Sequence, residues 1–246
     1  MASFHGMWSL GALTGAFTGG LFMKAAWDLD THFALMGALI ALIAVYFYFT
    51  LVPADKPRDH SQKLFAWPDR ALLLLGAICF CCALCEGAMA DWSSLYYKQV
   101  VNQLNKVSTA GYTAFTLLMA TGRLIGDRIT EQIGYKGSLL LDSILIACGL
   151  SLAIFLPSQW TVIAGFGLVG FGVATIIPIV YSLAGRSKTL APSVALAAVS
   201  TLGFTGFLFG PPIIGFIAHE TGLRWALLLV LVLAGVIGVL AGRVRS

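Results

Sequence analysis

Charged side chains are scarce in this sequence, and their scarcity is its most informative feature. Only 11% of the 246 residues are charged, whereas soluble domains carry about 25%. A net charge of +4 is too small to indicate a nucleic-acid partner. The mean hydropathy of +0.89 excludes a disordered chain, and 59% hydrophobic residues indicate a protein that lies in lipid.

The sequence also lacks the patterns of a disulfide framework, a metal centre or a nucleotide site. Cys79, Cys81, Cys82 and Cys85 match no common zinc spacing, so we expect them to pack as small apolar residues. Residues 165–170 match the dinucleotide pattern G-x-G-x-x-G, but they lie inside an apolar run and follow no strand. Close helix packing explains these glycines. We therefore predict no cofactor, and the absence of a nucleophile–base pair favours a protein that is not an enzyme.

Eight apolar runs are each long enough to cross a bilayer core of about 30 Å as a helix. They are apolar on all faces and do not alternate, which excludes a β-barrel. The predicted fold class is all-α, a polytopic membrane helix bundle. The runs are residues 4–23, 32–52, 71–90, 109–126, 137–156, 161–183, 193–217 and 224–242.

The distribution of Lys and Arg predicts how the chain is oriented. Eight spans place both termini on one side, and the connections on that side hold eleven basic residues against four on the other. The positive-inside rule makes the richer side cytoplasmic. Four tryptophans lie near the opposite interface, as an aromatic belt would: Trp27, Trp92, Trp160 and Trp225.

An internal repeat at an offset of 192 predicts how the chain is organised. Residues 9–11 recur as residues 201–203, and residues 32–35 recur as 224–227. Residues 1–52 then correspond to the last two helices of an N-terminal bundle, 53–70 to a cytoplasmic linker, and 71–246 to a six-helix C-terminal bundle. By this count four helices are absent, and the chain holds eight transmembrane helices of a twelve-helix fold. Repeats of this kind occur in secondary transporters.

A charged, glycine-containing motif follows the fourth run. Residues 122–128 read Gly-Arg-Leu-Ile-Gly-Asp-Arg, and residues 134–136 read Gly-Tyr-Lys. Gly122 and Gly126 would let two helices approach closely, and Arg123 could pair with Asp127 one turn later. Asp127 could face the positive N-terminus of the first helix, near residues 3–6, and latch the cytoplasmic side shut. The alternative is an ordinary charged loop that fixes the orientation of the chain in the membrane. Arg128 would then be one of its charges.

This motif resembles the Gly-x-x-x-Asp-Arg…Gly-x-Lys/Arg signature of the major facilitator superfamily, although Asp127 lies five residues after Gly122 instead of four. Residues 86–93 and 206–215 resemble bacterial permeases of the fucose-permease-like branch. The resemblance implies a secondary transporter with alternating access and a cytoplasmic gating motif. It also implies a small polar solute, with sugars as the favoured class.

Acidic residues within the apolar runs are candidates for solute or proton binding. Glu86 is the most deeply placed acid, and an intramembrane carboxylate indicates a functional site. It could bind a solute hydroxyl or carry a coupling proton, or be a protonated packing residue. Asp91 is a second candidate, although a wet helix end explains it better. We expect Asp142 to pair with Arg123 or Arg128, and His5 to make a polar contact at a helix end.

Prolines inside two apolar runs add further candidates. Pro178 and the pair Pro211-Pro212 remove backbone hydrogen bonds, and broken helices near a membrane midplane often bind solutes. Three polar residues near these breaks could line a cavity, as could Phe204; simple kinked packing is the alternative. The polar residues are Tyr181, Thr201 and Thr205.

The sequence as a whole predicts a proton-coupled permease of a small polar solute, with sugars as the favoured class. Its expected partners are the solute, protons and the lipid bilayer, with no nucleic acid and no obligate protein partner. Its expected location is the bacterial inner membrane, with both termini of the chain cytoplasmic. The alternative is a truncated membrane protein that does not transport, since the 246 residues alone are not expected to carry out uptake.

Overall fold

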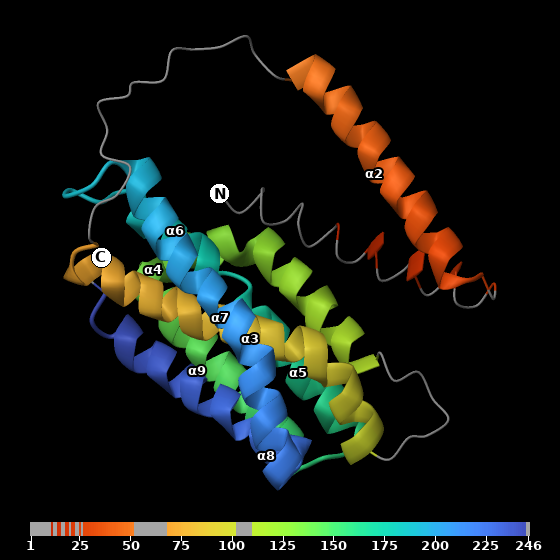
Figure 1. Ribbon diagram of the computed structural model, residues 1–246. Helices are drawn as coiled ribbons and strands as arrows, with labels where there is room; N and C mark the ends of the chain where they lie inside the picture. Colours follow the sequence, from red (N-terminus) through yellow and green to blue (C-terminus); the bar gives the residue numbers. More distant parts are fainter. Residues whose placement is uncertain are drawn as a thin grey trace. The chain divides into compact units, whose positions relative to one another are not determined.

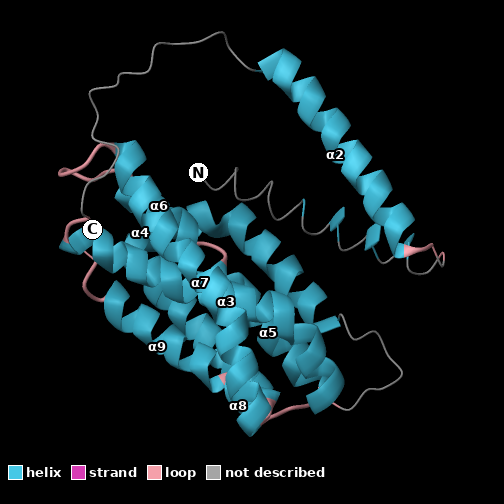
Figure 2. Cartoon of the chain, in the orientation of Figure 1, coloured by secondary structure: helices cyan, strands magenta, loops and turns pink. Residues whose placement is uncertain are grey.

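The computed structural model describes residues 11, 14–15, 18–19, 21–22, 25, 27–51, 68–101 and 110–244. All regular structure within these residues is helical, as Figure 2 shows, which confirms the predicted all-α class. The described residues up to 51 and those from 68 onward form two separate compact units. The first predicted run, 4–23, lies largely outside the described residues.

Eight helices are described, and six stretches are long and apolar enough to cross a membrane (Figure 1). The second to eighth predicted runs overlap these stretches to within two residues at their ends, so the prediction of a polytopic helical protein holds at this level. The helices are α2 (Leu29–Leu51), α3 (Arg70–Val100), α4 (Ala110–Phe155), α5 (Gln159–Val173), α6 (Ile176–Ala184), α7 (Pro192–Thr221), α8 (Leu223–Ala226) and α9 (Leu228–Ala241).

Helix α4 contains two helical segments that join at Gly134. Its 46 residues would reach about 69 Å as one straight helix, more than twice the thickness of a bilayer core. Gly134 has φ 74° and ψ 166°, a conformation that favours glycine because it has no Cβ. The two segments match the separate runs predicted at 109–126 and 137–156.

Glycines set the close contacts between the helices of the larger unit. A Cβ added at Gly206 of α7 would strike the backbone carbonyl of Phe80 in α3. A Cβ at Gly165 of α5 would strike the carbonyl of Gly149 in α4, and one at Gly170 would strike that of Phe115. The predicted packing role of the 165–170 glycines is therefore confirmed, because these positions have no room for a side chain.

The cysteines of α3 lie in the core formed by these contacts. Cys79, Cys81, Cys82 and Cys85 are all buried free thiols, in agreement with the predicted packing role. Cys82 Sγ lies 3.8 Å from the Val173 carbonyl oxygen of α5, where it donates a weak hydrogen bond. Cys148 in α4 is the exposed member of the five cysteines.

Polar contacts tie the helices together at both ends of α3. At its start, the Asp69 carboxylate accepts hydrogen bonds from the Leu72 N–H (2.8 Å) and the Thr189 hydroxyl (2.7 Å). At its far end, the Tyr96 hydroxyl donates to the Ala153 carbonyl at 2.6 Å, and Arg224 Nε donates to the neighbouring Ile154 carbonyl at 2.7 Å. These bonds fix α3 against α4 and the α6–α7 connection, and they fix α8 against α4.

Asp69 gives a first testable prediction, because it caps α3 and holds the α6–α7 connection. Replacing Asp69 with Ala removes both bonds and is expected to cost about 1 kcal/mol of unfolding free energy, whereas Asp69→Asn keeps an acceptor and costs less. The Leu72 N–H and the Thr189 hydroxyl hold the pKa of Asp69 below its ordinary value of 3.8. Its contribution is therefore complete above pH 3.8 and is lost as the pH falls through the lower folded-state pKa. Denaturant titration of both variants at pH 7 and at pH 3 measures this, and equal losses at the two pH values would contradict it.

Candidate functional site

A buried ion pair joins α3 and α4 inside the larger unit. Arg123 Nη2 lies 3.5 Å from Glu86 Oε1, and the two side chains are only 2% and 10% exposed. Helix α3 extends ten residues beyond the predicted run 71–90, so Glu86 lies near the middle of its 31 residues. An acid and a base placed this deep in an apolar bundle each need a partner of opposite charge.

The Glu86 carboxylate is only partly satisfied by this contact. Among the described residues its second oxygen, Oε2, is buried and accepts no hydrogen bond. A carboxylate oxygen can accept two hydrogen bonds or carry a proton. This oxygen therefore retains the capacity to bind a proton or a hydroxyl group.

The partner of Arg123 differs from the sequence prediction. Arg123 pairs with Glu86 and makes no ion pair with Asp127, which is exposed one turn further along α4. The physical reason is that a buried acid without a partner is costly, whereas water stabilises an exposed Asp127. An Arg that precedes Asp by four residues is also the weaker order for a pair on one helix.

The expected pairing of Asp142 with Arg123 or Arg128 is wrong in this structure. The Asp142 side chain is buried, and its Oδ2 accepts a hydrogen bond of 2.5 Å from the Thr175 hydroxyl. Arg128 is exposed on α4. The hydroxyl reaches the carboxylate because the chain leaves its helix at Thr175, between α5 and α6.

A cavity of about 150 Å³ lies between the first segment of α4 and the α5–α6 break. Arg123 lines it, so the cavity reaches the buried ion pair. Gly122 and Gly126 are buried beside it, where an added Cβ would crowd Ala174 or Thr175, and this close approach was predicted. The lining residues are Arg123, Gly126, Asp127, Thr130, Glu131, Tyr135, Ala174, Thr175, Pro178, Ile179 and Ser182.

The break between α5 and α6 forms one wall of this cavity. Helix α5 ends at Val173 and α6 begins at Ile176. Pro178 has no N–H, so the carbonyl of Ala174 loses the donor that a continuous helix would supply. The predicted break near Pro178 is confirmed, whereas α7 continues through Pro211 and Pro212 as one helix of 30 residues.

The remaining candidates do not line this cavity. Tyr181 is half-buried on α6, and Asp91 is exposed on α3. Thr201 and Thr205 donate to carbonyls of their own helix, Ala197 at 2.8 Å and Leu202 at 2.6 Å. A solute-binding role for these four residues stays a prediction.

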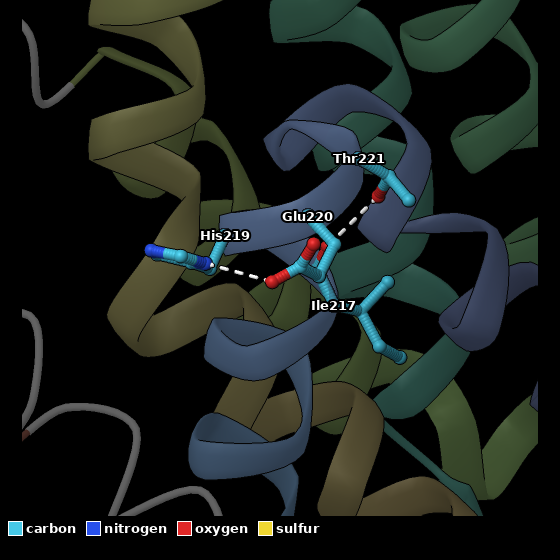
Figure 3. A network of polar contacts seen from close by, with 4 residues as sticks. All are labelled: Ile217, His219, Glu220 and Thr221. Carbon is cyan, nitrogen blue, oxygen red and sulfur yellow. Dashed lines mark hydrogen bonds and ion pairs between the residues drawn. The ribbon is translucent and has the colours of Figure 1, made fainter.

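Figure 3 shows a separate polar network at the end of α7. His219 Nδ1 lies 3.0 Å from Glu220 Oε1, and both side chains are largely exposed. The Thr221 hydroxyl donates to the Ile217 carbonyl at 2.8 Å. Exposed pairs of this kind contribute little to stability, so Glu220 suits a control substitution.

Two predicted features fall on residues that the structure does not describe. The expected contact of Asp127 with residues 3–6 and the polar contact of His5 lie outside the described residues. The repeat at an offset of 192 makes a third prediction, that residues 4–52 superpose on 195–242, and it also depends on residues outside the described ones. All three stay predictions.

Comparison with known proteins decides the family. The model of the Major Facilitator Superfamily matches residues 1–190 and 112–245, which together cover almost the whole chain. The chain belongs to the major facilitator superfamily. This confirms the family to which the motif at residues 122–136 pointed, and it agrees with the apolar helices of a multi-pass membrane protein.

Individual relatives of this superfamily member are bacterial. The chain is 36% identical over 231 residues to the membrane protein MosC of Rhizobium meliloti, covering 94% of this chain and 56% of MosC. It is 34% identical over 232 residues to an uncharacterized MFS-type transporter of Yersinia pestis, covering 92% of this chain and 59% of that protein. An uncharacterized transporter of Sinorhizobium fredii, y4wD, is 27% identical over 242 residues, covering 98% and 64%. The chain thus spans between 56% and 64% of the length of these relatives.

Proposed function

We propose that the protein is a permease that moves a small polar solute, with sugars as the favoured class, and that a proton gradient drives it. The observation that supports this most directly is the buried Glu86–Arg123 pair beside a polar cavity in a member of a transporter family. The sugar class rests on the resemblance of residues 86–93 and 206–215 to fucose-permease-like proteins.

The proposed coupling step takes place at Glu86. A proton that binds Oε2 neutralises the carboxylate and removes its attraction for Arg123. The Arg123 guanidinium, which lines the cavity, then becomes available to donate hydrogen bonds to hydroxyl or carbonyl oxygens of a solute. Loss of the proton restores the ion pair and favours release of the solute. Binding of the proton and binding of the solute thereby support one another.

Alternating access would expose this site to each side in turn. In the proposal, a bundle that includes residues 1–52 rocks against the bundle of residues 71–246, and residues 53–70 link the two. The close approach of Gly122 and Gly126 to the α5–α6 break supports a gating role for this motif. Arg123, Gly126 and Asp127 line the cavity, and Arg128 is exposed. We also propose that the protein lies in the bacterial inner membrane with both termini of the chain in the cytoplasm. It needs no obligate protein partner in this proposal.

Uptake of labelled monosaccharides at two pH values tests this function. Cells that express this chain within a transporter of its relatives' full length are expected to accumulate a sugar faster at the lower external pH. Glu86→Gln should reduce uptake at least tenfold or remove its pH dependence, because Gln cannot bind and release the proton. Glu220→Gln is the matched control, since Glu220 is an exposed acid outside the cavity. The variants are compared at equal amounts in the membrane.

Two results would count against the proposal. Equal uptake and an equal pH response in Glu86→Gln would reduce Glu86 to a packing residue. Absence of uptake for every sugar and every small organic solute tried would favour the alternative of a protein that does not transport. The transporter names of two of the relatives favour the main proposal over that alternative.

A further inference from the structure

Asp142 is a second buried acid, and the proposed coupling at Glu86 makes no use of it. It lies in the second segment of α4 with 4% of its surface exposed. Among the residues that the structure describes, its one hydrogen bond to another side chain comes from the Thr175 hydroxyl at 2.5 Å. Within the described part of the chain, no basic side chain forms an ion pair with it. An ionised carboxylate in this position would therefore lack a compensating charge.

The helices that pack around Asp142 supply few polar groups. From α3, the Cys82 thiol is the titratable group that interacts with it. From α5, Gly172 brings backbone against the Asp142 main chain, since a Cβ there would lie 2.7 Å from the Asp142 carbonyl oxygen. From α9, Gly238 faces the neighbouring Ser143. Burial of an unpaired charge among such groups costs several kcal/mol, roughly, which favours the acid with a bound proton.

Thr175 connects this acid to the cavity. It lines the cavity and donates to Asp142 Oδ2, so it lies between the two. A volume of about 150 Å³ exceeds the roughly 10–15 Å³ that one water molecule needs, so the cavity can hold several waters. A proton can then pass from a hydronium ion in the cavity to Thr175 Oγ1 while the hydroxyl proton of Thr175 passes to Oδ2 of the ionised Asp142, and a neutral water remains in the cavity. The hydroxyl ends with one proton, as it began.

We propose that Asp142 is a second proton-binding site, which exchanges its proton with the cavity through the Thr175 hydroxyl. The cavity then lies between two buried acids, because Arg123 connects it to Glu86 and Thr175 connects it to Asp142. This assignment is independent of which solute the protein moves.

A proton suits the site better than a metal cation. The described residues contain no group of three or more His, Cys, Asp or Glu side chains that could hold a metal ion. The Arg123 guanidinium also lines the cavity and would repel a second fixed cation. A proton needs only the carboxylate and one hydroxyl, which are the groups present.

Infrared difference spectroscopy of the purified protein tests the proposal without a transport assay. Spectra are recorded while the pH is raised, and the C=O stretching band of a protonated carboxyl group is followed. We use Glu86→Gln as the background, so that Glu86 adds no band. One carboxyl band is expected to disappear as the pH rises, and the same band should be absent after Asp142→Asn is added.

A second pair of variants keeps the acid and covers the case in which Asp142→Asn does not fold. Thr175→Val removes the hydroxyl and should shift the band to higher frequency, because the carboxyl group loses its hydrogen bond. Thr175→Ser keeps the hydroxyl and should leave the band in place.

Three results would overturn the assignment. The first is a titrating band that persists unchanged in Asp142→Asn, and the second is a band that Thr175→Val does not move. The third is loss of the band when Na⁺ replaces choline at constant pH, which would identify a metal cation site. Because the spectra report protonation directly, a failed sugar-uptake experiment would leave a positive result here intact.

Discussion

Replacing Arg123 with Met is expected to lower the free energy of unfolding by about 3–5 kcal/mol. This loss is larger than the one expected when Glu86 and Arg123 are both replaced. Glu86 and Arg123 are 10% and 2% exposed, so Met at position 123 leaves a buried carboxylate without its partner. Replacing both residues removes both charges and leaves no uncompensated one. The double variant Glu86→Gln with Arg123→Met should therefore be more stable than Arg123→Met alone.

A double-mutant cycle in detergent micelles measures this coupling. The free energy of unfolding is determined by denaturant titration for the wild type, the two single variants and the double variant. Additive losses would show that the two side chains do not interact energetically. That result would also remove the support for the proposed coupling step.

Gly170→Ala is expected to have the second large effect, a loss of about 3 kcal/mol. A Cβ at Gly170 would lie within the contact distance of the Phe115 carbonyl oxygen, which belongs to the backbone of α4 and cannot turn aside. Helices α4 and α5 would have to separate along their contact, and overpacking of this kind costs roughly 1–3 kcal/mol or more.

Gly235→Ala in α9 is the matched control, because a Cβ there meets no atom within 4 Å. Ala is the better helix former, so this substitution should raise stability by up to about 1 kcal/mol. The opposite signs of the two effects separate helix propensity from close packing. A loss of equal size at both positions would contradict the packing explanation.

The positions of the spans could be predicted from the sequence because hydropathy is a local property. Even the turn at Gly134 fell between two predicted runs. The end of α3 could not be placed, because Asp91 and Lys98 end the apolar run while the helix continues to Val100. The backbone needs no apolar side chains to stay helical, and Tyr96 and Tyr97 are buried against neighbouring helices there.

The partners of the buried charges could not be predicted, because they depend on packing between distant segments. Sequence spacing offers Asp127 and Asp142 as partners for Arg123, yet the position of Arg123 inside an apolar run indicates that it needs a buried acid. Glu86 is such an acid and was recognised separately, but sequence spacing does not show that α3 and α4 bring the two together. Thr175 gave no signal of its own, since it faces Asp142 only because the helix breaks there.

The uneven burial of the cysteines offers a way to attach a reporter to the native protein. Thiol reagents need access to a thiolate, and the four cysteines of α3 are enclosed. A lipid-soluble maleimide should therefore modify Cys148 alone, without any prior removal of cysteines. The adjacent Gly149 is buried against Gly165, whereas Cys148 is exposed about 100° further round the helix axis, so a dye at Cys148 points away from that junction. Quenching of the dye by spin-labelled lipids, in preference to aqueous iodide, would then report the depth of α4 in the bilayer.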